Sequence, residues 1–220
     1  MHSENELGYQ TRSDGFGILY GEIAGALIER CGRNGMGIVR KAVAAYGKKK
    51  GKRLREQYMG SGVRTDLHNL MAAEDGCWKD PRTLKTTVRD TPEAQLWEIY
   101  SCPLEKNWRD RGREEAGRLY CEEYLHALMD GYGEGAGQAN VSNSKTCRRD
   151  DRCVMAMYCR TANQNETQKG TGDGNGIIRE IPVEESTLLL YRCFIEVMKE
   201  EKDAEVVAAV TYGIKNGAEI

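Results

Sequence analysis

The residues best suited to acid–base chemistry lie in the segment 120–130. His126 is one of three histidines in the chain, with Glu122 four positions before it and Asp130 four positions after it. A helix turns by about 100° per residue, so these side chains share one face if the segment is helical. A carboxylate beside an imidazole fixes its tautomer and raises its basicity, which suits a general base. The alternative is an ion-paired stripe on a solvated helix face.

The eight cysteines are the other candidates for chemistry. In a chain of 220 residues with no secretion signal we expect reduced thiols and a cytoplasmic location. Cys121 lies about 140° around a helix from His126, so the two do not pair directly, and we expect Cys121 to face inward. Cys102, Cys121, Cys147 and Cys153 would supply four zinc thiolates if their segments met, although no Cys-x-x-Cys pair supports this. Simple packing is the alternative for each cysteine.

Two pairs of strands flank this segment. Residues 83–90 are β-branched and alternating, and residues 95–101 are aromatic-rich, which predicts a β-hairpin that ends at Cys102-Pro103. Residues 138–144 and 152–160 predict the second pair. In the later strand, alternation puts four sulfur-bearing side chains on one face: Cys153, Met155, Met157 and Cys159.

A helix-rich stretch to residue 130 separates the two pairs of strands. The order ββ–helices–ββ predicts an α+β fold, in which an antiparallel four-stranded sheet carries helices on one face. A helical N-terminal part is expected at 16–30 and 38–58, and C-terminal helices at 183–200 and 203–215.

The remaining segments are polar. Residues 1–15 have little apolar surface and predict a flexible arm, and residues 161–175 predict a flexible loop. Residues 16–220 are then expected to form a single α+β domain.

Charge and hydropathy argue against two classes of partner. Charged residues make up 30% of the chain but nearly cancel, to a net charge of −2, so no overall field attracts nucleic acid. No apolar run approaches the ~20 residues that span a bilayer. One basic run without interleaved aromatic residues is interpreted as a solvated helix face: Lys48, Lys49, Lys50, Lys52, Arg53 and Arg55. We therefore expect no nucleic acid and no membrane as partners.

Several short motifs lie between residues 97 and 160: Trp97 followed by Cys102-Pro103, then Trp108 and Gly112, then Tyr120-Cys121 with His126, and finally the strand around Cys153. This set resembles the L-2-amino-thiazoline-4-carboxylic acid hydrolase family. The resemblance extends over most of residues 16–160, and residues 97–160 carry its clearest part.

The resemblance implies a hydrolase that acts on a non-peptide C–N bond of a small cyclic amidine or amide. Water or a thiolate attacks a trigonal carbon while the leaving nitrogen is protonated. A small-molecule substrate is the expected partner, with a homo-oligomer left open. The hypothesis makes His126 the general acid or base, oriented by Glu122. The nucleophile or pocket thiols would be Cys102, Cys121 and Cys153. A positive field at Cys102 would come from Arg109, Arg111 or Arg113. The substrate-binding residues would be Trp108 and Tyr124.

Two other interpretations stay open. The arrangement of cysteines also resembles the 4-vinyl-reductase type of sensor domain, a small-molecule-binding module in which cysteines hold zinc. The cofactor is left open, with zinc belonging to this sensor interpretation. A structural or assembly subunit is the third interpretation, for which His126→Ala and Cys121→Ala would alter stability alone.

Overall fold

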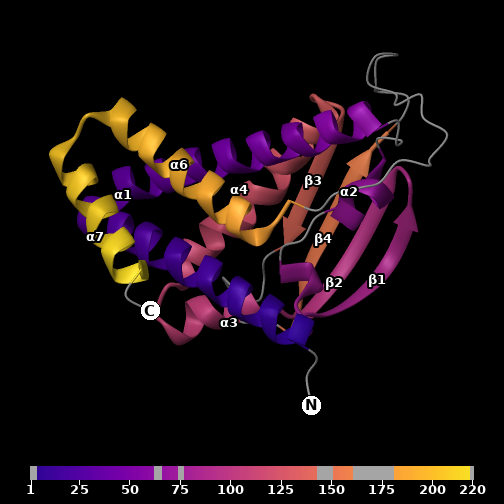
Figure 1. Cartoon of the computed structure of the whole chain (residues 1–220), viewed down its shortest axis with the longest axis horizontal. Coiled ribbons are helices and arrows are strands. Elements are labelled where there is room, and N and C mark those ends of the chain that lie inside the picture. Colours follow the sequence, from indigo (N-terminus) through magenta and orange to yellow (C-terminus); the bar gives the residue numbers. More distant parts are fainter. Residues whose placement is uncertain (1–3, 62–65, 74–76, 143–150, 161–180, 219–220) are drawn as a thin grey trace.

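The structure is a computed structural model that describes residues 4–61, 66–73, 77–142, 151–160 and 181–218. Its first half contains α1 (Glu4–Ser61), α2 (Leu67–Ala73), the 3-10 helix η1 (Cys77–Lys79), β1 (Leu84–Thr91) and β2 (Ala94–Ser101). Its second half contains α3 (Pro103–Asp110), α4 (Glu114–Gly133), β3 (Gly137–Ser142), β4 (Cys153–Cys159), α6 (Val183–Glu201) and α7 (Ala204–Ala218). The α+β class and the order ββ–helices–ββ are thereby confirmed (Figure 1). The loop expected at 161–175 lies outside the described residues.

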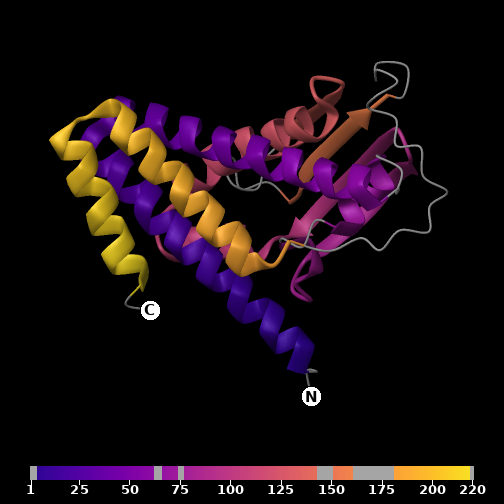
Figure 2. The same ribbon diagram turned by 45° about the horizontal axis from the view of Figure 1, so that its top comes forward.

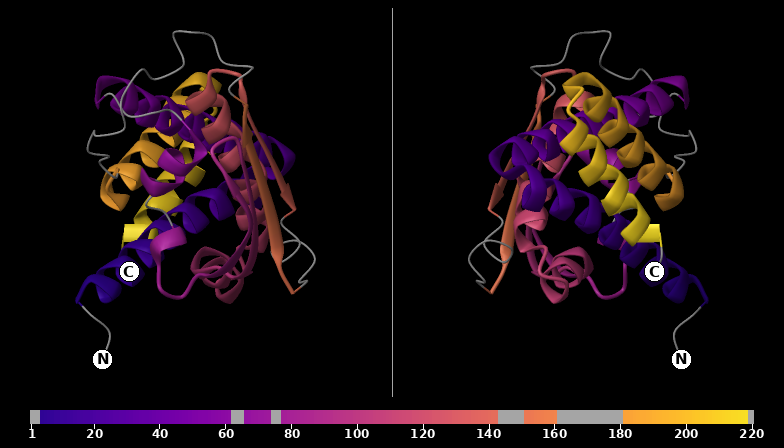
Figure 3. Two further views of the ribbon diagram at one scale, coloured as in Figure 1. Left: turned by 90° about the vertical axis from the view of Figure 1, so that its right-hand side faces the viewer. Right: turned by 90° about the vertical axis from the view of Figure 1, so that its left-hand side faces the viewer.

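The four strands form one antiparallel sheet in the order β1-β2-β4-β3, and the helices cover one of its faces (Figure 3). Trp97 of β2 lies opposite Met155 of β4. Because side chains alternate along a strand, the inner face of β4 carries the predicted sulfur-rich set, and all four of its members are buried: Cys153, Met155, Met157 and Cys159. The sheet therefore contributes sulfur-bearing side chains to the core beneath the helices.

Helix α1 consists of two arms that meet at Gly32, whose φ of 56° and ψ of −128° are not helical (Figure 1). Glycine adopts a positive φ without the steric cost that other residues meet. The break lies between the two helices expected at 16–30 and 38–58. Figure 2 shows α6 and α7 packed along these arms. Among the described residues, no helix combines the length and the apolar character needed to cross a membrane.

The N-terminal end of α1 differs from the flexible arm expected at 1–15, because the helix begins at Glu4. Tertiary contacts explain the difference. Arg82, just before β1, donates to the Asp14 carboxylate at 3.0 Å and to the carbonyl of Gln10 at 3.2 Å. The same guanidinium donates to the buried Asp80 carboxylate at 2.6 Å. Arg82 therefore joins the start of α1 to the turn that precedes the sheet.

The basic run of α1 is only partly the solvated face that the sequence suggested. Lys48, Lys49 and Arg53 are exposed, and they form ion pairs with carboxylates of α4 and α6. Lys50 and Arg55 are instead buried. The interpretation fails for these two because the run follows a helix, so every third or fourth residue turns toward the core.

Candidate functional site

A pocket lies between the inner face of the sheet and helices α1, α3, α4 and α6. The cavity measures about 60 Å³, several times the ~10–15 Å³ that one water occupies by that measure. Among the described residues, six of the lining side chains are aromatic: Phe16, Tyr46, Trp78, Trp108, Tyr120 and Tyr124. The others are the aliphatic Leu104, Leu125, Met155 and Val183, the thiols Cys102 and Cys121, and the polar Ser13, Lys50 and Ser186. Such a site suits a small ligand that presents a few polar groups.

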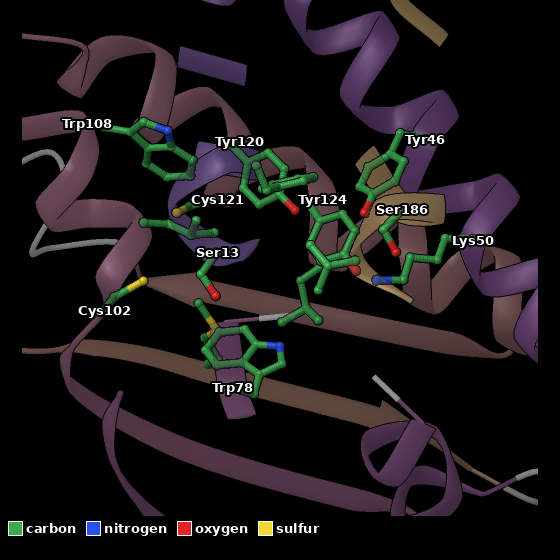
Figure 4. A pocket seen from close by; sticks show the side chains of 15 residues that line it. Ser13, Tyr46, Lys50, Trp78, Cys102, Trp108, Tyr120, Cys121, Tyr124 and Ser186 are labelled. Carbon is green, nitrogen blue, oxygen red and sulfur yellow. The ribbon is translucent and has the colours of Figure 1, made fainter. Parts of the chain in front are cut away.

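Two of the three proposed thiols line this pocket. Cys102 is the N-cap of α3 and is followed by Pro103 at the first helical position, and Cys121 comes from α4 (Figure 4). The start of a helix carries partial positive charge, which favours an anionic sulfur at Cys102. Cys153 is not a lining residue. It lies buried on β4, two residues before Met155, which does reach the pocket.

Two of the three arginines expected to supply a field at Cys102 form ion pairs with carboxylates outside the pocket. Arg109 donates to Glu105 at 2.5 Å, and Arg113 pairs with Glu22 at 3.0 Å and also with Glu29. None of the three arginines proposed from the sequence lines the pocket. The positive charge in the lining comes from Lys50.

The structure does not bring His126 and Glu122 into the pocket. His126 is exposed on α4, and Glu122 accepts a 2.5 Å hydrogen bond from Arg40 of α1 and another from Arg118. Burial has the largest single effect on the pKa of Arg40 and lowers it, but the hydrogen bonds that Arg40 donates to Glu123 and Glu122, with the charges of these carboxylates, raise the pKa overall. The ion pairs link α4 to the second arm of α1. Helical spacing put His126 and Glu122 on one stripe, as expected, but that stripe faces away from the pocket.

Lys50 is the charged residue among the lining residues that the sequence interpretation missed; the hydroxyls of Ser13 and Ser186 were missed as well. The Lys50 side chain lies on the inner side of α1, with Nζ 6.0 Å and 5.8 Å from the ring centroids of Tyr46 and Tyr124. The sequence does contain a pattern that indicates an inward-facing position 50. The apolar stripe Val39, Val43, Tyr46 and Leu54 continues through position 50 at spacings of three and four residues.

Trp108 and Tyr124, proposed to bind substrate, belong to an aromatic wall. Tyr124 stacks between Tyr46 and Tyr120, at centroid distances of 5.3 Å and 5.0 Å. Trp108 packs on Tyr120 at 5.4 Å, and its indole N–H donates to the carbonyl of Gly17 at 2.9 Å. The wall is therefore tied to the first arm of α1.

Replacing Trp108 with phenylalanine is expected to lower the free energy of unfolding by about 1–3 kcal/mol, because the Gly17 carbonyl loses a buried donor and the ring volume falls. Urea denaturation would measure the change. Trp78→Phe is the matched control, since Trp78 lines the same pocket but is only partly buried. An equal loss in both variants would contradict the role given to the indole hydrogen bond.

The zinc interpretation has little geometric support in the described part of the chain. That part contains no group of three or more histidine, cysteine, aspartate or glutamate side chains placed to hold a metal. Cys147, one of the four thiols considered for zinc, lies outside the described residues.

The chain is thus an α+β protein with two thiols in an aromatic pocket between its helices and its antiparallel sheet. A sequence model of the L-2-amino-thiazoline-4-carboxylic acid hydrolase family matches residues 16–155, more than half of the chain, so the chain belongs to this family. The resemblance inferred from the sequence is thereby confirmed. Neither curated proteins nor solved structures gave a match. All but three of the pocket residues fall inside the matched range; Ser13, Val183 and Ser186 lie outside it.

Proposed function

We propose that this chain is a hydrolase that opens a non-peptide C–N bond of a small cyclic amidine or amide in the aromatic pocket. The observation that carries the proposal is the presence of Cys102 and Cys121 in one cavity within the family-matched range. The aromatic walls give the pocket an apolar surface that suits a planar ring.

Cys102 is the nucleophile of the proposed reaction. Its thiolate attacks the trigonal carbon of the amidine, so that an S–C bond forms while the ring C–N bond breaks and the leaving nitrogen takes a proton. Water then attacks the same carbon, and the S–C bond breaks to release the Cys102 thiolate. The attacking water gives up a proton, which balances the proton taken by the leaving nitrogen. Cys121 is the second thiol of the cavity and is the alternative nucleophile.

Turnover combined with thiol mapping tests this proposal. The purified protein should open L-2-aminothiazoline-4-carboxylate, followed by NMR of the ring protons, and iodoacetamide should inactivate it unless substrate is present. Mass spectrometry should find the label on Cys102 or Cys121 ahead of Cys31 and Cys193. Burial raises the pKa of Cys193 to about 11, although Lys49 opposes this. Burial, Glu205 and Asp203 raise the pKa of Cys31.

Two results would contradict the hydrolase. One is the absence of ring opening by an intact, folded protein, and the other is full turnover after both pocket thiols have been alkylated. Stoichiometric zinc measured in that inactive protein would favour the sensor-type binding module instead.

A further inference from the structure

We propose that Lys50 and Ser186 form the carboxylate-recognising end of the pocket and determine which cyclic amidines the enzyme accepts. This inference rests on the hydrolase function proposed above. It gives the site two ends, with thiols at one and an anion-binding pair at the other.

Lys50 brings a cation to the pocket from the middle of the second arm of α1. The residue is only 1% exposed, and it lines the cavity beside Tyr46 and Tyr124. An ammonium has three N–H donors, so it can serve an acceptor of the protein and an oxygen of a ligand together. Among the described residues, no aspartate, glutamate, arginine or histidine lines the cavity. Lys50 is therefore the charged side chain that the described lining presents to a ligand.

Ser186 supplies a hydroxyl whose hydrogen bonding is incomplete. The residue is 3% exposed and lines the cavity, and its Oγ has no hydrogen-bond partner within the described structure. The next residue behaves differently, because Thr187 Oγ1 donates to the Val183 carbonyl at 2.7 Å. A buried hydroxyl without a partner is unfavourable, so a ligand oxygen that accepts from Ser186 would relieve that cost.

The start of α6 also favours an anionic ligand group at this end of the pocket. Val183 and Ser186, both in the first turns of this 19-residue helix, line the pocket. The N-terminal end of a helix carries partial positive charge and free N–H groups, which favour an anion. The acidic residues of that turn are exposed and paired on the outside, Glu184 with Arg12 at 3.0 Å and Glu185 with Arg53 at 2.5 Å.

The two ends of the pocket are separated in space. Figure 4 shows Lys50 and Ser186 at one end and Cys102 at the opposite end, with the rings of Tyr120 and Tyr124 between them. A cyclic amidine with a carboxylate on its ring would place that carboxylate at Lys50 and Ser186. Its reacting carbon would then point toward the thiol end.

The test compares two substrates that differ only in the carboxylate: L-2-aminothiazoline-4-carboxylate and 2-amino-2-thiazoline. For Lys50→Met we expect kcat/KM for the carboxylated ring to fall by at least about tenfold, because a charge-assisted hydrogen bond is lost. The value for the ring without a carboxylate should change by less than threefold. Ser186→Ala should also lower the ratio of kcat/KM for the carboxylated ring to kcat/KM for the ring without a carboxylate, by a smaller factor than Lys50→Met.

Lys49→Met is the matched control, because Lys49 is the exposed neighbour that pairs with Glu196 on α6. It should leave the ratio of the two substrates unchanged. Equal losses for both substrates in Lys50→Met, or no change of the ratio in both pocket variants, would overturn the assignment.

Binding without turnover separates this inference from the proposed reaction. L-Thiazolidine-4-carboxylate has the carboxylate but lacks the amidine carbon, and Trp78 and Trp108 in the lining provide a fluorescence signal. Thiazolidine, which lacks the carboxylate, is the control ligand. If L-thiazolidine-4-carboxylate binds more weakly to Lys50→Met than to the natural protein while thiazolidine binds equally to both, the carboxylate site is supported even if the protein opens no ring. Turnover of both amidines with no effect of Lys50→Met would leave the hydrolase standing and remove the site.

Discussion

The Gly51→Ala substitution is expected to lower the free energy of unfolding by about 3 kcal/mol or more, a large fraction of the ~5–15 kcal/mol that stabilises a typical domain. A Cβ at this position would lie 2.1 Å from the Leu128 carbonyl oxygen and 2.8 Å from the Tyr132 nitrogen. Both are backbone atoms of α4 and cannot rotate away. The two helices would have to separate, which would open the aromatic wall that α4 contributes to the pocket.

Gly37→Ala is the control for this prediction. Gly37 belongs to the same helix, but an added Cβ meets nothing within 4 Å. Alanine there should raise stability by about 0.5–1 kcal/mol, because glycine has the lower helix propensity. Urea denaturation of the two variants should show shifts of opposite sign. Similar shifts would mean that the contact between α1 and α4 tolerates a methyl group.

The elements of this fold could be predicted from local sequence signals. The hairpin of β1 and β2 follows from β-branched alternation, a turn containing Pro92, and the stop at Cys102-Pro103. The sulfur-rich inner face of β4 follows from the two-residue period of a strand. In each case a short pattern determines the geometry without help from distant residues.

The orientation of mixed helices was harder to predict. On α4, positions 115, 118, 122 and 126 recur at helical spacing and carry charged or imidazole side chains. They form ion pairs or face solvent. That stripe is typical of an outer face, yet His126 within it was the strongest catalytic candidate of the sequence. On α1 a buried residue was instead assigned to the surface, because the charge of Lys50 concealed its place in an apolar stripe.

The N-terminal segment shows a different limit. Residues 4–15 have little apolar surface of their own, and contacts with distant residues hold Ser13 and Asp14 in place. Asp14 pairs with Arg82, 68 positions along the chain. Ser13 lines the pocket and hydrogen-bonds Asp80. Burial opposes a low pKa at Asp80, but hydrogen bonds from Arg82 and Ser13 hold it below its usual value. Composition alone does not reveal such contacts.

Loss of the thiol at position 102 is expected to have the largest effect on activity. Cys102→Ala should lower kcat for ring opening by about 10³-fold or more, because the proposed covalent step has no nucleophile without the sulfur. Cys102→Ser should be almost as slow, since the described part of the pocket lining contains no histidine or carboxylate to take the proton of a hydroxyl at this position. Steady-state kinetics would give both values, and thermal unfolding would verify that each variant is folded.

Three further variants make the prediction specific to Cys102. Cys121→Ala removes the other pocket thiol and should cost less than about tenfold, because it alters packing in the site but leaves the nucleophile. Cys153→Ala acts on the buried face of β4 and should lower stability before activity. His126→Ala should leave kcat within about twofold of the natural protein, because the imidazole is exposed outside the pocket. A loss in His126→Ala comparable to that in Cys102→Ala would restore the histidine as general base. A larger loss in Cys121→Ala than in Cys102→Ala would move the nucleophile to α4.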